Sequence, residues 1–192
     1  MLGTSANVVC NQGLDWCIKN DIDIVCMACG FYEDEDELLL RKVQEASRKM
    51  LIFAAPTNEG NAEEIAYPAR YHGEVFCMFS SNGLVKKSVG LNPSKGLGLF
   101  DLAILGEHIK TYPGDKISSG TSFSTAIAAG FAARLLDFSR HKDVGTILGG
   151  KAEKLKKKRN MTGVFLSIAH GSYDRPYHCI KPWALLNERL LR

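Results

Sequence analysis

Hydrophobic and polar positions along the chain follow two periods, one typical of buried strands and one of amphipathic helices. Short apolar runs occupy residues 22–27, 51–55, 74–80 and 99–105. Residues 11–20 and 38–50 instead carry an apolar side chain every three or four positions, and the acidic residues 33–36 precede the second segment. Continuous apolar runs are typical of parallel strands covered on both faces. The alternation predicts an α/β fold with a mostly parallel sheet flanked by helices.

A further helix, rich in small residues, is predicted over 126–133, and the sequence Gly-Thr-Ser of residues 120–122 leads into it. A serine at the start of a helix lies near unpaired backbone N–H groups and the positive end of the helix dipole. This setting stabilises the negative charge that develops in acyl transfer, which makes Ser122 a candidate nucleophile. The simpler alternative is that Ser122 is only the helix N-cap. Gly130, inside this helix, suggests close packing against the sheet.

The basic run at residues 151–159 is the strongest local concentration of charge. It could contact nucleic acid or an anionic membrane, or act as a nuclear signal. We interpret it as the solvated face of a helix whose inward residues are Leu155, Met161, Val164 and Phe165. The whole chain is nearly balanced, with 24 basic and 21 acidic residues and a net charge of +3. No apolar run is long enough to span a membrane. We therefore expect neither a nucleic-acid partner nor a membrane partner.

The six cysteines include a Cys-x-x-Cys motif at Cys26 and Cys29. This spacing occurs in redox and zinc sites, but the second ligand pair of a structural zinc site is missing from the sequence. We interpret the cysteines as reduced, buried, small apolar residues. We expect no metal site and no cofactor, because no acidic cluster compels one and the run at 33–37 is more simply a solvated helix start. Unpaired cysteines and the lack of a secretory signal favour a cytoplasmic protein.

Four motifs, in order along the chain, resemble the subtilisin-like serine proteases (subtilases). The segment 119–126 with Ala-Ala-Gly at 128–130 is similar to the nucleophile motif of that family. The segment 51–61 looks like the family's strand and Asn-Glu-Gly loop, and 66–71 resembles the Tyr-Pro-Ala segment that follows it. Residues 22–30 resemble the strand that ends in a substrate-lining glycine turn. The resemblance covers about residues 7–138, and the sequence at 125–130 looks like the fungal intracellular type.

The resemblance implies a subtilisin-like three-layer fold and a role for five residues. Ser122 would be the nucleophile, and the side chain of Asn58 would donate a hydrogen bond to the oxyanion. Gly30, Gly120 and Thr121 would lie in the substrate-binding region. The residues themselves leave simpler alternatives open: Asn58 could bond its own backbone in a turn, Gly120 could serve a special backbone angle or a close approach, and Thr121 could order the turn.

The resemblance also shows what the sequence lacks. The family's catalytic aspartate and histidine motifs, Asp-Ser/Thr-Gly and His-Gly-Thr, do not occur before Asn58, and the first histidine is His72. None of the five histidines occupies a family catalytic position. A serine without an adjacent base is a weak nucleophile, so we expect this chain alone to be a very poor protease. We interpret residues 1–192 as a partial peptidase domain, incomplete at the N-terminus, with a core at 7–138 and a basic helical extension at 139–192.

Two functions are compatible with this sequence. The first is a serine-type endopeptidase that acts on peptides or proteins, with its aspartate and histidine supplied by a segment absent from this chain. The second is a non-catalytic peptide- or protein-binding module derived from a subtilase. Two departures from the family pattern weaken the expectation of efficient peptide binding: Leu105-Gly106-Glu107 stands where relatives often have Ala-Pro-Gly, and Cys26 and Ala28 replace asparagine and serine.

Overall fold

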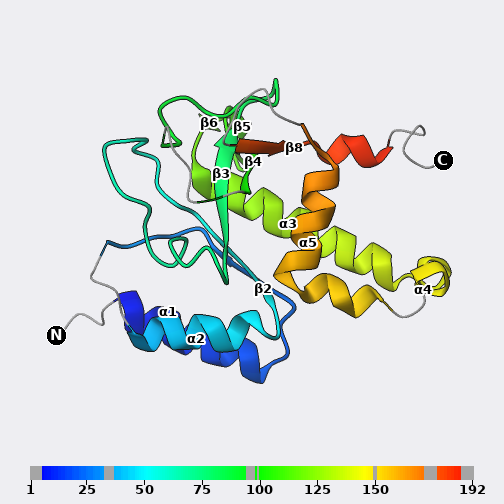
Figure 1. Ribbon diagram of the computed structural model, residues 1–192. Coiled ribbons are helices and arrows are strands. Elements are labelled where there is room, and N and C mark those ends of the chain that lie inside the picture. The colour runs from blue at the N-terminus through cyan, green and yellow to red at the C-terminus, as the bar shows by residue number, and fades with distance from the viewer. Residues whose placement is uncertain are drawn as a thin grey trace.

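A central sheet of six strands organises the computed structural model, which describes residues 6–32, 37–93, 98, 100–148, 151–170 and 177–186 (Figure 1). The strand order is β1-β2-β3-β4-β8-β7. The first five strands are parallel, and β7 runs antiparallel to β8. The strands are β1 (Ile24–Met27), β2 (Leu51–Ala54), β3 (Phe76–Ser81), β4 (Asp101–Leu105), β8 (Tyr177–Ile180) and β7 (Ala169–His170). The predicted α/β fold with a mostly parallel sheet is confirmed.

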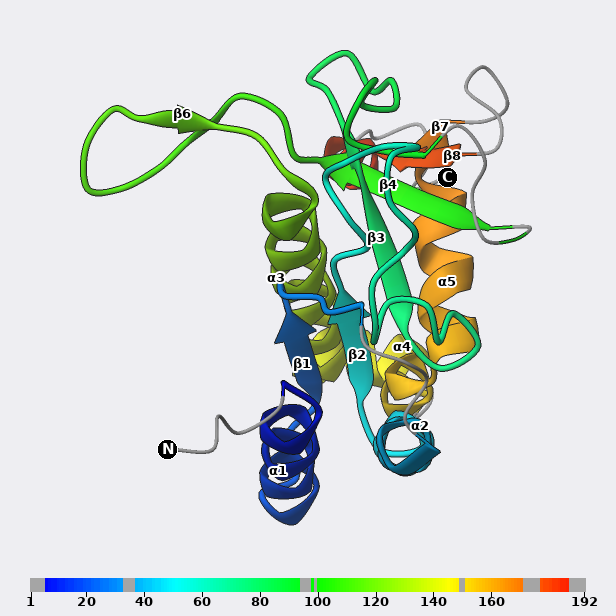
Figure 2. The same cartoon turned by 90° about the vertical axis from the view of Figure 1, so that its left-hand side faces the viewer.

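Helices cover both faces of this sheet, and a short hairpin projects from it. The helical segments are α1 (Ala6–Lys19), α2 (Glu37–Ser47), α3 (Thr121–Arg140), α4 (Lys142–Leu148), α5 (Lys158–Ser167) and the short 3-10 helices η1 (Ala152–Lys156) and η2 (Pro182–Leu186). The hairpin joins β5 (Ile109–Lys110) and β6 (Ile117–Ser118) and lies between β4 and α3 in the sequence. Figure 2 shows its loop reaching away from the body of the protein. None of the helices in the described ranges is long and apolar enough to cross a membrane.

Alternate side chains of the strands pack into two separate hydrophobic layers, one on each face of the sheet. In β2, Leu51 and Phe53 pack with α3 and α5, whereas Ile52 and Ala54 pack with α1 and α2. All four side chains are buried, as a strand covered on both faces requires. Rings of Phe53, Phe76 and Phe165 pack together on the α3 side, and the Phe53 and Phe76 rings stack with centroids 4.6 Å apart. This alternation with a period of two sets the three-layer arrangement.

Residues after 138, expected to form an extension, contribute to both the sheet and the core. Strand β8 pairs with β4, and the buried Met161 and Phe165 bring α5 against the sheet. The prediction of a single helix around the basic run is wrong. The backbone of Lys157, between η1 and α5, is extended and not helical. Met161 and Phe165 do point inward as predicted, whereas Leu155 and Val164 are only half-buried.

The expectation that Gly130 packs against the sheet is also wrong. Gly130 lies on the solvent face of α3, and a Cβ atom there would meet no neighbouring atom within 4 Å. The close approach between α3 and the sheet comes instead from Ala128, Ala129 and Ala132, which are buried against the strands. Small side chains at these positions let the helix axis lie near the sheet.

An ion-pair network anchors the start of β1 to the end of α3. The Asp23 carboxylate accepts bonds from Arg140 Nη1 and Lys156 Nζ, each at 2.6 Å. Glu153 lies 2.9 Å from Arg140 Nη2 and 3.3 Å from Lys156 Nζ. The hydrogen bond from Arg140, with help from Lys156, lowers the pKa of Asp23 from its ordinary value of 3.8. The network therefore favours the folded state whenever Asp23 is ionised.

We predict that Asp23→Asn lowers the free energy of unfolding at pH 7 by about 1 kcal/mol, because a networked but partly exposed pair contributes little more. The depressed pKa means that this contribution is present above pH 3.8 and is lost as the pH falls through the folded-state pKa. Urea unfolding of both proteins between pH 7 and pH 2.5 measures the difference. Asp137→Asn is the matched control, since its contact with Arg134 is exposed and 3.7 Å long. Equal losses in the two variants contradict the prediction.

Candidate active site

The carboxyl ends of the first two strands meet the start of α3 around one open cavity of about 220 Å³. Gly30 follows β1 and Asn58 follows β2, so both lie where α/β sheets usually bind ligands. Four of the five predicted site residues line this cavity: Gly30, Asn58, Thr121 and Ser122. Gly120 lies next to the Asn58 carboxamide, because a Cβ atom at Gly120 would be 3.4 Å from Asn58 Oδ1. Residues far apart in the sequence are thus brought together as expected.

Asn58 caps helix α3 from a distant loop. Its Oδ1 atom accepts a hydrogen bond from the Thr121 backbone N–H at 2.7 Å and lies 3.0 Å from Thr121 Oγ1. Only the oxygen of a carboxamide can accept from a backbone N–H, so the orientation of the side chain is determined chemically. The Nδ2 amide is then the donor that remains, and it has no acceptor within the described part of the chain. The alternative that Asn58 bonds its own turn is wrong, because Thr57 Oγ1 accepts the local bond from Glu59 N.

Thr121 orders the turn, which is the alternative that the sequence left open for it. Its side chain is buried, and its hydroxyl lies 3.0 Å from both the Thr57 carbonyl oxygen and Asn58 Oδ1. A hydroxyl has one proton, so it donates to one of these oxygens at a time. Thr121 therefore holds the loop after β2 against the first turn of α3.

Ser122 is the second residue of α3 and not its N-cap, which is Gly120. The Ser122 hydroxyl donates to the Ala28 carbonyl oxygen at 3.1 Å and is accessible from the cavity. The N-cap interpretation of this serine is therefore wrong. Its position in the first turn still exposes it to the positive end of the helix dipole, which favours negative charge beside it.

Close backbone approach explains one of the two predicted glycines. A Cβ atom at Gly30 would lie 2.6 Å from the Ala66 Cβ, because Phe31 and Tyr67 exchange backbone hydrogen bonds of 3.2 and 2.9 Å next to it. Gly120, in contrast, has extended backbone angles that any residue adopts, so the special-angle interpretation is wrong there. At Gly120 a methyl group would make ordinary contact with Asn58.

Several residues of the cavity wall were not predicted from the sequence. Tyr32 donates its hydroxyl to Thr57 Oγ1 at 3.1 Å, and Glu59 and Glu63 add carboxylates to the lining. Burial and the neighbouring Glu63 raise the pKa of Tyr32, so the phenol stays protonated as this donor at neutral pH. Of these three residues, Glu59 could have been found from the sequence, because the Asn-Glu-Gly motif places it next to Asn58.

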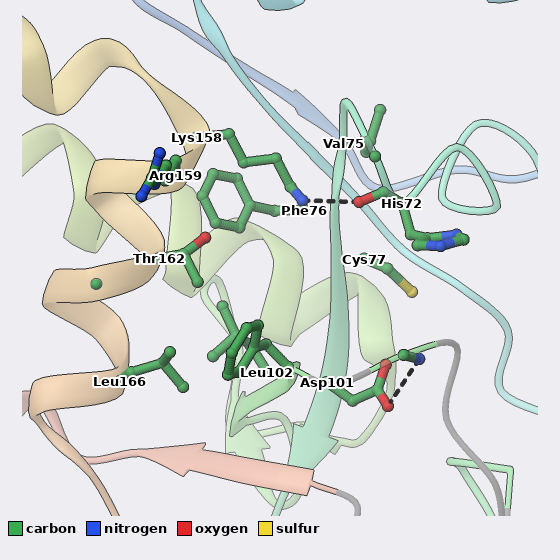
Figure 3. Close-up of a pocket in the computed structure, with 14 residues that line it drawn as sticks. His72, Val75, Phe76, Cys77, Asp101, Leu102, Lys158, Arg159, Thr162 and Leu166 are labelled. Atoms are coloured by element: carbon green, nitrogen blue, oxygen red, sulfur yellow. Dashed lines mark hydrogen bonds between the residues drawn. The ribbon is translucent and has the colours of Figure 1, made fainter.

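No histidine of the described residues lines the cavity. His141 follows the far end of α3, and an α-helix of 20 residues is about 30 Å long. His108 is exposed beyond β4, where its backbone N–H donates to Ser119 Oγ, and His170 and His178 lie on β7 and β8. The remaining one, His72, precedes β3 and borders a second cavity of about 410 Å³, shown in Figure 3. That cavity contains none of the predicted site residues.

The cysteine prediction is wrong at the Cys-x-x-Cys motif. Cys26 and Cys29 are both exposed rather than buried, although all six cysteines are free thiols. Cys29 lines the Ser122 cavity between Ala28 and Gly30. Within the described residues, no group of three or more histidine, cysteine or acidic side chains could hold a metal ion.

The chain is similar to known proteins, although no family model matches it. The chain is 33% identical over 129 residues to the intracellular serine protease of Paenibacillus polymyxa. The aligned region covers 64% of this chain and 38% of that protein. It is 31% identical over 131 residues to subtilisin BL of Lederbergia lenta, covering 64% and 45%. A solved cold adapted subtilisin-like serine proteinase matches with a TM-score of 0.67 at 24% identity, over 91% of this chain and 59% of that one.

The fold and the site define an α/β protein in which a serine at a helix start faces an asparagine that follows a parallel strand. In sequence, the chain is similar to subtilisin-like serine proteases, which are hydrolases. The chain spans less than half the length of the curated relatives described above. The fungal intracellular type is not shown by these similarities and stays a prediction.

We predict that Asn58→Ala lowers the free energy of unfolding by about 1–2 kcal/mol, because the first N–H of α3 loses its acceptor. Asn58→Asp keeps an acceptor oxygen and adds negative charge at the helix N-terminus, so it should retain the stability of the unchanged protein. Urea unfolding at pH 7 compares the two variants. An Asp variant as unstable as the Ala variant would show that the cap is not what Asn58 contributes.

Proposed function

We propose that the chain carries the nucleophile and part of the oxyanion hole of a serine endopeptidase that acts on peptides or proteins. The observation that carries this proposal is the pairing of Ser122 with Asn58 in one cavity, with Asn58 Oδ1 engaged by Thr121. That bond leaves Nδ2 as the group that can donate to an oxyanion formed on a carbonyl attacked by Ser122. A fixed donor of this kind stabilises the transition state more than the ground state.

The other three residues have supporting roles in this proposal. Thr121 positions Asn58 through the two contacts described above, and the backbone at Gly30 and Gly120 borders the path of the substrate chain. The absence of a side chain at Gly30 keeps the turn close to Ala66. The peptide would therefore pass over the carboxyl ends of β1 and β2.

The isolated chain should be a weak catalyst. Ser122 donates its proton to a backbone carbonyl, which is far too weak a base to remove it. In subtilisin, loss of the catalytic histidine costs about 10⁶ in kcat, and the oxyanion hole with binding leaves about 10³–10⁴ over the reaction in water. The proposal therefore includes a base and an orienting carboxylate that residues outside the described part of this chain would supply.

The occupied Ser122 hydroxyl also supports the second candidate, a non-catalytic binding module for peptides or proteins. A serine that bonds a backbone carbonyl can serve as a wall of a binding cavity without any chemistry. The two candidates make opposite predictions for covalent modification of Ser122 in the presence of an added base.

A cytoplasmic location accompanies either candidate. It is supported by the names of two relatives, the intracellular serine proteases of Paenibacillus polymyxa and Bacillus subtilis, and by the six free thiols.

We predict that a fluorophosphonate labels Ser122 slowly and that free imidazole accelerates the labelling, because imidazole replaces the absent base in the cavity. The rate should rise with pH through the pKa of free imidazole. Asn58→Asp, which should keep the fold, is expected to reduce the rate by about 10²–10³, the loss known for the corresponding asparagine of subtilisin. Intact mass and peptide mapping measure the site and the rate.

Ser119→Ala is the matched control, an exposed serine three residues before Ser122. Its labelling rate should equal that of the unchanged protein. Label that persists in Ser122→Ala, or that maps elsewhere, contradicts the catalytic proposal. Folded protein that binds peptides but shows no imidazole-dependent label would favour the binding module.

A further inference from the structure

The cavity of about 410 Å³ that His72 borders lies at the opposite end of the sheet from the Ser122 cavity. Phe76 begins β3 and Asp101 begins β4, and both line this space, which we call the α5 cavity. It therefore borders the amino ends of parallel strands, whereas Ser122 lies at the carboxyl ends. The two cavities share no lining residue. The volume is within the range of about 300–1,000 Å³ that small-molecule sites have.

One side of the α5 cavity is apolar. Phe76 and Leu102 are buried at its base, and Leu166 of α5 is half-buried beside them. Figure 3 shows Thr162 and Leu166 pointing from α5 toward Phe76 and Leu102. A hydrocarbon chain placed between α5 and these strands would lose contact with water along this side.

Lys158, the first residue of α5, adds a half-buried cation to this apolar side. Its Nζ atom donates to the His72 carbonyl oxygen at 2.7 Å and lies 5.4 Å from the centroid of the Phe76 ring. An ammonium has three N–H donors, and no acidic side chain of the described residues forms an ion pair with this one. Burial lowers the pKa of Lys158 from its ordinary value of 10.5. An anion bound beside the ammonium would offset that loss of water.

We propose that the α5 cavity binds an aliphatic carboxylate, with its carboxylate on Lys158 and its hydrocarbon chain against Phe76, Leu102 and Leu166. The two parts of such a ligand match the two parts of the cavity, the ammonium and the apolar side. The proposal does not depend on the proposed hydrolase function, because the Ser122 cavity is separate.

The other charged groups of the cavity favour a ligand with a single negative charge. Arg159 lines the cavity and is exposed, so it adds positive charge close to Lys158. Asp101 is buried in the wall and accepts a bond from the Gly98 N–H at 3.3 Å, and the charge of Glu74 also acts on Lys158. These two carboxylates would repel a phosphate dianion more strongly than a carboxylate.

Gly163 keeps part of the cavity open. It lies inside α5 and lines the cavity, and a Cβ atom there would meet no neighbouring atom within 4 Å. Glycine inside a helix is less stable than alanine, and no close approach requires it at this position. A larger side chain at Gly163 would instead occupy space that the ligand needs.

The first test compares ligands by titration calorimetry of the full chain at pH 7. Octanoate should bind about tenfold more tightly than hexanoate, because two more methylene groups are buried. It should also bind at least about tenfold more tightly than 1-octanol, which lacks the charge. Octylamine, which reverses the charge, should bind more weakly than octanoate. Equal or tighter binding of 1-octanol or octylamine, or no saturable binding of octanoate at millimolar concentration, would overturn the proposal.

The second test locates the carboxylate of the ligand. Lys158→Met keeps an apolar stem and removes the charge, so octanoate should bind about tenfold more weakly while the affinity for 1-octanol stays the same. Lys154→Met is the matched control, an exposed lysine of the same basic run outside the cavity lining, and it should leave octanoate binding unchanged. The same loss in both variants, or no loss in Lys158→Met, would refute the role of Lys158.

The third test fills the cavity. Gly163→Leu should weaken octanoate binding by at least about tenfold, and it should keep the fold because leucine favours a helix more than glycine does. Urea unfolding verifies that the variant is folded. A folded Gly163→Leu protein that binds octanoate as tightly as the unchanged protein would show that the ligand does not occupy the α5 cavity.

Discussion

The hydrogen bond from the Thr121 backbone to the Asn58 carboxamide is the contact on which the site depends. It spans 63 positions in the sequence and joins the loop after β2 to the first turn of α3. A helix start leaves backbone N–H groups without intrahelical partners, so one of them needs an acceptor from elsewhere. By supplying it, Asn58 determines both where α3 begins relative to the sheet and which atom of its own side chain faces the cavity. Stability and the direction of the Nδ2 donor follow from the same bond.

This contact is possible because the sheet is parallel at that edge. Gly30 follows β1 and Asn58 follows β2, and parallel strands end on the same side, so both loops reach α3. The buried alanines of α3 bring its axis near the strands, and Gly106 admits its first turn, since a side chain there would overlap the Ser124 hydroxyl. The glycine at 106, which departs from the family pattern, is therefore explained by packing.

The strands, helices and the convergence of Ser122 with Asn58 could be predicted because local patterns determine them. Continuous apolar runs identify β2, and motifs at strand ends lead to the same edge of the sheet. The sequence could not predict contacts that depend on how separate elements pack. The break at Lys157 accompanies a hydrogen bond from its Nζ atom to the Arg48 carbonyl oxygen, and the ion pair of Asp23 with Arg140 depends on the start of β1 lying beside the end of α3. Neither partner is near in sequence, so no spacing rule points to it.

The bond from Ser122 to the Ala28 carbonyl shows why a serine at a helix start is not by itself a catalytic site. A hydroxyl becomes a strong nucleophile only when a base of suitable pKa takes its proton in the transition state. In the proposed function, the helix dipole and Asn58 would act on charge that forms after attack, so neither could replace that base. Under the proposed function, this geometry would stabilise an intermediate that the described residues have little means to produce. Any group that supplies the base must displace the Ala28 carbonyl as the acceptor of the Ser122 proton.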